Sequence, residues 1–199
     1  MRNYHLEYSH YMPEELSEFG FAEIGEGLLI DRTVRFYHPE YIHFGSHVRL
    51  DAYSVLSASQ EEIFIGSYVH MAVGVTLLGN ARIDIEDFCG LSARVSIFSS
   101  SDDYSGGWLT NPTIPDQFRH VTTATVTLKK HAIVGTGSVI LPGVTIGLGA
   151  SVGALSLVNK SVPDFMVVSG NPIKKVGFRS RNILDREIQF MTMLKESKE

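Results

Sequence analysis

The chain has 199 residues, a formal net charge of −5 and an aromatic content of 10 %. This length allows one continuous hydrophobic core, and the acidic balance excludes the overall positive field of proteins that bind nucleic acid or membrane surfaces. The sequence has no run of 18 apolar residues and no apolar h-region at its start, so we expect neither a transmembrane helix nor a secretory signal.

The first predicted element is a short helix in the segment PEELSEF, which begins at Pro13. Proline is favoured in the first turn of a helix, where its missing N–H costs nothing. The helix lies within residues 1–23, which we expect to form a cap over the N-terminal end of the repeat that follows, because the end of a repeating structure must be covered.

Residues 24–162 carry a repeat of six residues. Large apolar residues recur six positions apart in groups of three, and where the register slips, it does so after the third hexad. The first hexad positions, grouped by turn, are Ile24, Ile30, Phe36; Phe44, Leu50, Leu56; Ile65, Met71, Leu77; Ile85, Leu91, Ile97; Leu128, Val134, Ile140; and Ile146, Val152, Val158. Three hexads per turn predict an all-β fold, a parallel β-helix of triangular section.

Two further hexad positions support this fold. The fifth position also points inward and must be small or slim, as in Val48, Val69, Cys89, Val95, Ala132, Ser138, Ala150 and Ser156. Glycine often follows the first position, where a side chain would crowd the bend: Gly25, Gly45, Gly66, Gly135, Gly147 and Gly153. Because Cys89 occupies an inward position, we interpret it as a buried hydrophobic residue rather than a nucleophile.

Two segments interrupt or follow the repeat. Residues 99–123 are rich in Ser, Gly, Pro and Asp, which predicts an inserted loop, and loops this long are more often functional than decorative. Its aromatic residues Tyr104, Trp108 and Phe118 are expected to anchor it on a neighbouring subunit or to stack on a base. Residues 163–199 are predicted to form a tail that ends in an amphipathic helix.

The run GTGSVILPGVTIGLGASVGALSLVNKSVPDFMVVSGNPIKKV resembles the C-terminal signature of hexapeptide-repeat acyltransferases. This resemblance implies a left-handed β-helix and a homotrimer that holds acetyl-coenzyme A between neighbouring prisms. By motif position, Thr136, Ala154, Asn159 and Lys160 would line the pantetheine path, and Lys174, Lys175 and Arg179 would meet the coenzyme phosphates. The concentration of cations in this tail fits a ligand that carries several phosphate charges.

The segments PEELSEFGF, IGSYVHMA, DFCGLSARVSIFSSSDDYSG and NPTIPDQFRHVTTATVTLKKHAIVG are similar to those of bacterial nucleotide-sugar N-acetyltransferases. That resemblance implies transfer of acetyl to the amine of a nucleotide-linked deoxyamino sugar, in the cytoplasm, for O-antigen or another surface glycan. It implies no metal. The lone cysteine, which cannot form a disulfide within the chain, also fits a cytoplasmic location.

The catalytic residues are less obvious. Related galactoside and maltose acetyltransferases carry a histidine where this chain reads SSSDDYSGG, so that role cannot be carried over. Candidates are His70, which precedes the inward Met71 and should point outward, and the loop residues Asp102 and Asp103, which otherwise would be turn formers. His131 lies at a corner and is interpreted as structural. Because a neutral sugar amine needs no strong base to attack a thioester, the missing histidine favours an amine acceptor.

Three alternatives remain open. A sugar or polysaccharide O-acetyltransferase would use the same fold and coenzyme. A metal-dependent hydrolyase similar to γ-type carbonic anhydrase shares the prism, although His43 and His47 flank one corner within a hexad, unlike the ligands of that family. A non-catalytic scaffold would use the prism only for assembly and would bind no coenzyme.

Overall fold

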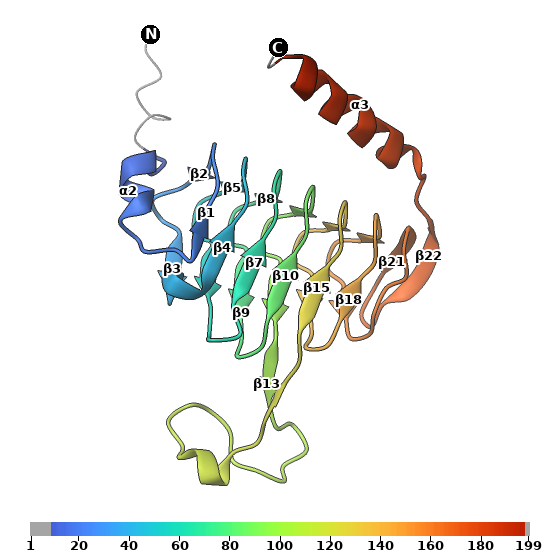
Figure 1. The fold of residues 1–199 in the computed structure, drawn as a ribbon. Coiled ribbons are helices and arrows are strands. Elements are labelled where there is room, and N and C mark those ends of the chain that lie inside the picture. Colours follow the sequence, from blue (N-terminus) through green and yellow to red (C-terminus); the bar gives the residue numbers. More distant parts are fainter. Residues whose placement is uncertain (1–8, 198–199) are drawn as a thin grey trace.

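The computed structural model describes residues 9–197. In it the chain winds into a parallel β-helix, from which one long loop and a C-terminal helix extend (Figure 1). The predicted fold class is therefore confirmed. The expectations for the start of the chain, namely the missing h-region and the first part of the cap, fall largely on residues 1–8, which lie outside the described residues. None of the helices described between residues 9 and 197 is long and apolar enough to cross a membrane.

Within residues 9–197, the column has three parallel sheets, and each coil contributes a strand to each sheet in turn. The first sheet consists of β1 (Glu23–Ile24), β4 (Ile42–Phe44), β7 (Ile63–Ile65), β10 (Ile83–Ile85), β15 (Val126–Leu128) and β18 (Thr145–Ile146). The second consists of β2 (Leu29–Ile30), β5 (Arg49–Leu50), β8 (His70–Met71), β11 (Gly90–Leu91), β16 (Ile133–Val134), β19 (Ser151–Val152), β21 (Met166–Ser169) and the antiparallel β22 (Lys174–Phe178). The third consists of β3 (Arg35–Tyr37), β6 (Val55–Ser57), β9 (Thr76–Leu78), β12 (Ser96–Phe98), β17 (Val139–Ile140) and β20 (Leu157–Val158).

We call the turns between the first and second sheets the first edge, those between the second and third sheets the second edge, and those that lead to the next coil the third edge. The strand register aligns like hexad positions: Ile65 pairs with Ile85, and Ile85 with Leu128 across the inserted loop. The first hexad positions are buried as predicted, except for Ile24, which is 42 % exposed, and the half-buried Phe36. Both lie in the first coil, at the end of the column.

The N-terminal cap covers this end. Helix α2 (Pro13–Ser17) begins at the predicted proline and buries Leu16 in the core. The Glu15 carboxylate accepts hydrogen bonds from the Met12 N–H and from Arg32, at 2.7 and 2.5 Å. Because this carboxylate accepts a backbone and a guanidinium hydrogen bond, its pKa lies below its usual value. The cap is thereby tied to the turn that follows β2.

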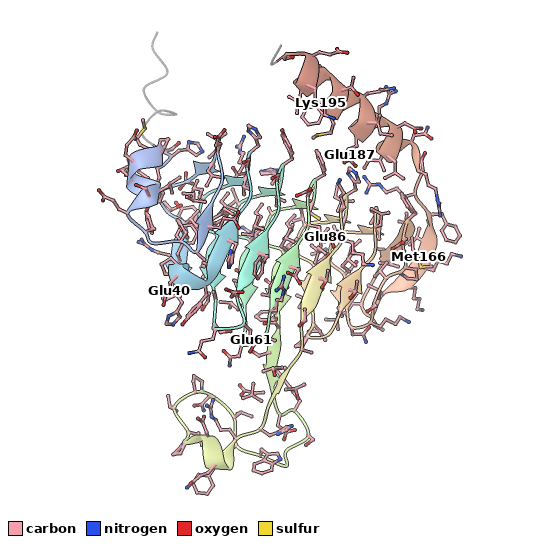
Figure 2. The ribbon with its side chains drawn as sticks, in the orientation of Figure 1. Glu40, Glu61, Glu86, Met166, Glu187 and Lys195 are labelled. Atoms are coloured by element: carbon pink, nitrogen blue, oxygen red, sulfur yellow. The ribbon has the colours of Figure 1, made fainter. Side chains whose placement is uncertain are left out.

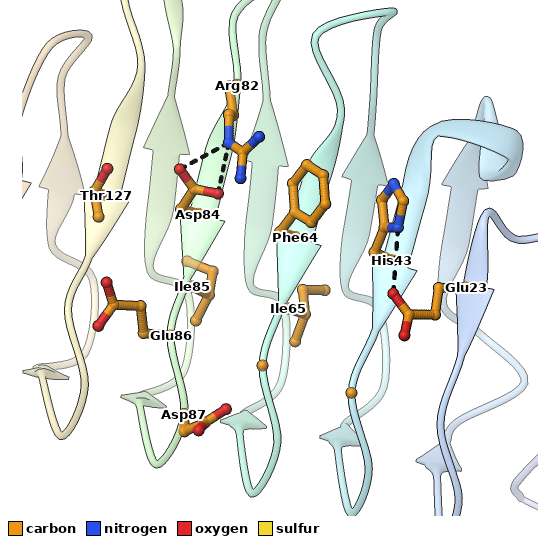
Figure 3. Close-up of a pocket in the computed structure, with 12 residues that line it drawn as sticks. Glu23, His43, Phe64, Ile65, Arg82, Asp84, Ile85, Glu86, Asp87 and Thr127 are labelled. Carbon is orange, nitrogen blue, oxygen red and sulfur yellow. Dashed lines mark hydrogen bonds and ion pairs between the residues drawn. The ribbon is translucent and has the colours of Figure 1, made fainter.

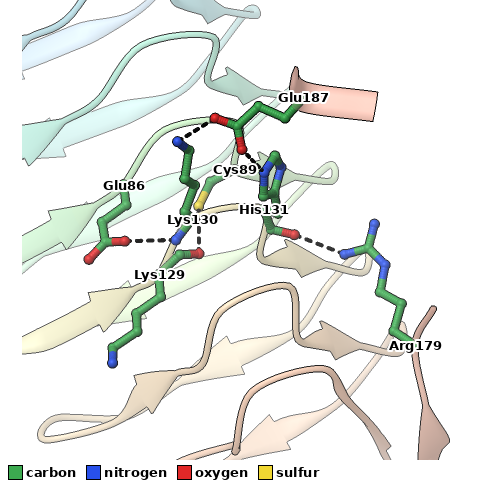
Figure 4. Close-up of polar contacts among 7 residues, drawn as sticks. All are labelled: Glu86, Cys89, Lys129, Lys130, His131, Arg179 and Glu187. Carbon is green, nitrogen blue, oxygen red and sulfur yellow. Dashed lines mark hydrogen bonds and ion pairs between the residues drawn. The ribbon is translucent and has the colours of Figure 1, made fainter. Parts of the chain in front are cut away.

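The inward fifth positions are buried as predicted. The Cys89 thiol is 2 % exposed and donates to the Lys129 carbonyl at 3.3 Å (Figure 4). Burial raises the pKa of this thiol to about 12, so the reactive thiolate is suppressed. The interpretation of Cys89 as a core residue is confirmed.

The glycines of the repeat lie where neighbouring coils approach most closely. A Cβ added at Gly135 would come within 2.4 Å of the Ala154 amide nitrogen, and one added at Gly25 within 2.4 Å of the Gly45 carbonyl. Real Cβ atoms do not approach backbone so closely, so these glycines allow the coils to stack at the spacing that their backbone hydrogen bonds require.

The predicted loop leaves the third edge as a two-stranded stalk, in which β13 (Ser100–Asp102) pairs antiparallel with β14 (Val121–Thr123). Figure 1 shows this stalk projecting away from the column, with the short 3₁₀ helix η2 (Asp116–Phe118) near its tip. Another 3₁₀ helix, η1 (Pro39–Tyr41), precedes β4. Because β15 pairs directly with β10, the insertion does not interrupt the stacking.

The tail begins with β21, which still pairs in parallel with β19, so the parallel stacking extends past residue 162, where we placed the boundary. After β22 the chain enters the predicted helix α3 (Asn182–Glu196). Phe190 meets Tyr68 edge to face at 5.2 Å, and Glu187 accepts from Lys130 Nζ at 2.5 Å and contacts His131 Nε2 at 2.7 Å (Figure 4). Helix α3 is therefore fastened to the first edge.

Rings from successive coils form a stack on this edge, in which His47 lies on Tyr68, Tyr68 on Phe88, and Phe88 on His131, with centroids 4.8 to 5.1 Å apart. His131 is only 5 % exposed. Its position between Phe88 and Glu187 fits the interpretation of His131 as a structural residue.

Gly135→Ala is expected to destabilise the column by about 1–3 kcal/mol, because the added methyl group overlaps the backbone of the next coil. Gly177→Ala is the matched control, since a Cβ at Gly177 meets nothing within 4 Å. Thermal unfolding of both variants tests the stacking model, and equal melting temperatures would contradict it.

The docking of α3 should weaken in acid. Partial burial alone would raise the pKa of Glu187, but the hydrogen bonds from Lys130 and His131 outweigh it and lower the pKa. A carboxylate with a lowered folded-state pKa stabilises the fold above its ordinary value of 4.5, and the contribution is lost as pH falls through the lower value.

We therefore expect the protection factors of the α3 amides, each calculated relative to the intrinsic exchange rate at the same pH, to fall below pH 4.5. Glu187→Gln should show fast exchange already at neutral pH, whereas Glu196→Gln, an exposed position on the same helix, should behave as the wild type. A helix whose protection did not change with either pH or the Glu187 substitution would contradict the proposed anchor.

Candidate active site

The predicted base His70 lies on β8 of the second sheet, next to the second edge. Its side chain is 51 % exposed while that of Met71 is buried, so it points outward as predicted. His70 Nε2 lies 2.9 Å from Asp51 Oδ2, and Arg49 Nε donates to Asp51 Oδ1 at 2.7 Å. Partial burial alone would raise the pKa of Asp51, but these two hydrogen bonds lower it overall. The carboxylate therefore stays ionised and orients the imidazole.

Asp51 and Ser92 occupy equivalent positions of the second edge, two coils apart. Ala72 lies between them, since the Asp51 N–H donates to the Met71 carbonyl and the Ala72 N–H to the Leu91 carbonyl. Ser92 therefore lies on the same edge as Asp51, in the coil after that of His70, which pairs with Gly90. Ser92 was not predicted as a site residue. It is the second residue of its hexad, as Asp51 is of its own, and this shared position indicates that both lie on the second edge.

The second edge continues into the residues expected to line the pantetheine path. Thr136 and Ala154 are neighbours in adjacent coils, because the Leu155 N–H donates to the Thr136 carbonyl at 2.8 Å. From the second coil onward, the third positions of these hexads are small: Ala52, Val73, Ala93, Thr136 and Ala154. A strip of small side chains leaves backbone groups accessible to an extended ligand.

The other residues expected to bind coenzyme are not all on this strip. Asn159 and Lys160 follow β20 and are exposed at the third edge, across the third sheet from Ala154. Lys174 and Lys175 are exposed on β22. The half-buried Arg179 donates from Nη1 to the carbonyls of His131 and Gly149, at 2.8 and 3.2 Å, so it also fastens the tail to the column.

The two loop aspartates behave differently. Asp103 accepts from the Ser105 hydroxyl at 2.7 Å and from the Ser105 and Trp108 amides at 3.1 Å. The Ser105 hydrogen bonds are the main reason that its pKa falls to about 2. Asp103 therefore organises the turn, which was the alternative interpretation from sequence.

Asp102 lines a cavity of about 480 Å³ together with Phe98, Tyr104 and Pro142. Within residues 9–197 its carboxylate makes no hydrogen bond. The loop leaves the third edge, whereas His70 lies on the second sheet, so a single chain does not bring Asp102 and His70 together. Nearby, Trp108 and Phe118 are about half exposed, and Tyr104 almost wholly.

The side chains on the first sheet form a different surface, which borders a cavity of about 560 Å³. Figure 3 shows Phe64 between His43, whose ring is stacked on it at 4.1 Å, and Arg82, whose guanidinium lies 3.9 Å from the Phe64 centroid. Four carboxylates line this cavity: Glu23, Asp84, Glu86 and Asp87. Such a surface repels phosphates. His47 is not part of it, because its ring stacks on Tyr68 at the first edge.

Figure 2 shows side chains projecting along the column and the loop in this view. Among the described residues, only the second edge combines a histidine–aspartate pair, a hydroxyl without a hydrogen-bond partner and a strip of small residues. It is thus the candidate site for a reaction that needs an extended ligand and a proton acceptor.

Comparisons with known proteins agree on one kind of relative. No protein-family model matches the chain. A dTDP-4-amino-4,6-dideoxy-D-glucose acyltransferase of Escherichia coli is 38 % identical over 181 residues, which cover 90 % of this chain and 94 % of the relative. A crystal structure of a variant of an N-acyltransferase from Bacillus cereus, in complex with dTDP-4-amino-4,6-dideoxyglucose and coenzyme A, superposes with a TM-score of 0.90 at 39 % identity, covering 93 % of this chain and 98 % of the other.

A maltose O-acetyltransferase from Clostridium difficile has a TM-score of 0.56 at 20 % identity, covering 84 % of this chain and 75 % of the other. At this identity the likeness shows a shared fold alone.

Asp103→Asn is expected to loosen the loop turn, because an amide offers weaker acceptors to the Ser105 and Trp108 donors. Hydrogen exchange of the amides of residues 105–108 should accelerate several-fold. Asp102→Asn is the matched control, since its side chain makes no hydrogen bond within residues 9–197. Equal exchange in the two variants would contradict the structural role of Asp103.

Proposed function

Because the chain belongs to the family of dTDP-4-amino-4,6-dideoxyglucose acyltransferases, we propose that it transfers acetyl from acetyl-coenzyme A to the 4-amine of this dTDP-linked sugar. The identity of 38 % over nearly the full length of both chains is the observation that carries the sugar assignment. The acyl group of the donor could be longer than acetyl, since a structure of the Bacillus cereus N-acyltransferase holds dTDP and 3-hydroxybutyryl-coenzyme A. The product would serve O-antigen or another surface glycan, made in the cytoplasm.

The reaction needs little from the protein beyond positioning. The neutral amine nitrogen attacks the thioester carbonyl, a C–N bond forms, and the C–S bond breaks as the coenzyme leaves as thiolate. The nitrogen gives up one proton and the sulfur takes one, so no proton is lost or gained overall. His70, held by Asp51, would relay this proton, and backbone N–H groups would stabilise the oxyanion, at about 3 kcal/mol for one well-placed donor.

A homotrimer would complete the site. In one chain the third sheet separates Asp102 from His70, and the exposed Tyr104, Trp108 and Phe118 of the loop offer large amphipathic rings for a contact with another copy. In the proposed assembly the loop of one copy lies beside the second edge of its neighbour, so that His70 and Asp102 come from different chains.

The solved structures of a relative suggest that Ser92 also belongs to the proposed site. Crystal structures of the Bacillus cereus N-acyltransferase include variants at a serine and at an aspartate ten positions further along that chain. The present sequence has one serine followed ten positions later by an aspartate, Ser92 and Asp102. We therefore assign these two residues to the acceptor amine: the Asp102 carboxylate would accept a hydrogen bond from the neutral amine, and Ser92 would orient it.

The coenzyme would lie along the second edge beyond Ser92. Thr136 and Ala154 would line the pantetheine path of one copy, while Asn159 and Lys160 at the third edge would face the path of a neighbouring copy. Lys174 and Lys175 would bind the coenzyme phosphates. Arg179 would donate to the same phosphates from the guanidinium nitrogens other than Nη1, which already donates to backbone carbonyls.

The function is tested by measuring free thiol release from acetyl-coenzyme A and from 3-hydroxybutyryl-coenzyme A with two matched acceptors. These are dTDP-4-amino-4,6-dideoxyglucose and dTDP-6-deoxyglucose, which has a hydroxyl group at the same carbon. We expect thiol only with the amine. Equal release with the hydroxyl acceptor would instead support the O-acetyltransferase alternative.

The shared site is tested by complementation. His70→Asn should lower kcat by about 10²-fold, the usual contribution of a general base, and Asp102→Asn should mainly raise the KM of the sugar. When both variants are co-expressed, about one quarter of the sites in randomly mixed trimers contain both wild-type residues, so activity should rise well above that of either variant alone.

The double variant His70→Asn/Asp102→Asn, co-expressed with either single variant, is the control and should show no such recovery. Wild-type rates in both single variants would refute the assignment of these residues and leave thioester positioning alone as the source of catalysis.

A further inference from the structure

The segment that joins the last strand to the C-terminal helix is short. Only residues 179–181 lie between β22 and α3. Strand β22 carries Lys174 and Lys175, the lysines proposed to bind the coenzyme phosphates. None of residues 182–196, which form α3, is buried, so the helix depends on a few contacts for its place. Because the connection is so short, a shift of α3 also shifts the end of β22.

Two residues of this tail converge on His131. Arg179 precedes α3, and its Nη1 donates to the His131 carbonyl at 2.8 Å. Glu187 lies within α3, and its Oε2 is 2.7 Å from His131 Nε2. Figure 4 shows the two contacts on different parts of the same residue, one on the backbone and one on the ring. His131 therefore links the helix to the arginine.

The surroundings of His131 leave it little room to move. Its side chain is 5 % exposed, its ring is stacked on Phe88 at 5.1 Å, and its N–H donates to the Asp87 carbonyl at 3.1 Å. Its backbone is left-handed, with φ of 62°, a conformation that costs energy in a residue other than glycine. Closely packed groups transmit displacement to one another. Loss of the Glu187 contact is therefore expected to shift the carbonyl that Arg179 uses.

This carbonyl helps to set the direction of the Arg179 guanidinium. Nη1 also donates to the Gly149 carbonyl at 3.2 Å, at the corner of the next coil, where the backbone is again left-handed with φ of 61°. Within residues 9–197, Nε and Nη2 of Arg179 make no hydrogen bond. Because the guanidinium is planar and rigid, fixing Nη1 also fixes where the other nitrogens point.

From this convergence we infer that docking of α3 and binding of the coenzyme are coupled through His131, with Glu187 as a positioning residue for Arg179. The inference rests on the proposed function, to which it adds a role for the C-terminal helix. Such coupling is reciprocal. If the docked helix strengthens coenzyme binding, the bound coenzyme strengthens helix docking by the same factor.

The test is calorimetric titration of the intact assembled protein with coenzyme A. Glu187→Gln should raise the Kd for coenzyme A about fivefold or more, the lower end of ordinary couplings between sites, and should leave the Kd for dTDP unchanged. Phe190→Ala weakens docking at the other contact, the ring of Tyr68, and should act in the same direction. Glu196→Gln is the matched control, because this residue is exposed on the same helix, and it should bind both ligands as the wild type does.

A double-variant cycle shows whether Glu187 acts through Arg179. Arg179→Gln/Glu187→Gln should raise the Kd for coenzyme A no more than Arg179→Gln alone does. Saturating coenzyme A should also slow hydrogen exchange of the α3 amides in the wild type but not in Arg179→Gln.

Three results would overturn the inference: wild-type affinity for coenzyme A in Glu187→Gln, additive effects in the cycle, or exchange in α3 that coenzyme A does not change. Disassembly of Glu187→Gln in size-exclusion chromatography would also overturn it, because the weaker binding would then reflect an incomplete site. Lys174→Gln separates the two proposals. Weaker coenzyme binding in Lys174→Gln beside wild-type binding in Glu187→Gln would reject the coupling and support the proposed coenzyme site, whereas a wild-type protein that bound no coenzyme A would overturn both.

Discussion

The close stacking of one coil on the next is the constraint on which the rest of this structure depends. Backbone hydrogen bonds fix the spacing between coils, and Gly25 and Gly135 permit it because no Cβ would fit there. Once the spacing is fixed, residues at the same hexad position form columns along the prism. Every side chain is then assigned to the core, to a flat face or to an edge, and neighbours in space need not be neighbours in sequence.

This arrangement places structural contacts and the candidate site on different edges of the column. The first edge carries a stack of rings, on which α3 is fastened through Phe190 and Glu187. Among residues 9–197 nothing comparable covers the second edge, which carries the Asp51–His70 pair, the Ser92 hydroxyl and a strip of small residues. The inserted loop leaves from the third edge, so within one chain Asp102 lies away from the second edge. A repeat that looks uniform in sequence thereby acquires three unlike edges.

Acyl transfer to an amine requires few catalytic groups, which agrees with the small number of polar side chains on the second edge. The proton that the amine loses ends on the coenzyme thiolate, so the reaction consumes and releases no proton overall. The protein must therefore mainly align two long ligands and stabilise an oxyanion. An edge is well suited to that task, because it is straight, has accessible backbone groups and runs the full length of the column. Asp103, which the sequence suggested for the site, accepts hydrogen bonds from Ser105 and Trp108 within the loop turn.

The amino-acid sequence by itself determined the β-helix, its register, the inserted loop, both helices and the buried state of Cys89, because each depends on a short-range period or on local composition. His70 was also predictable as an outward residue from its place before Met71. The sequence could not pair His131 with Glu187, which are 56 positions apart, nor give Arg179 its carbonyl partners. Those relations arise only when the tail folds back onto the first edge, because the hexad repeat fixes the register of the coils but not the place of the segment that follows them.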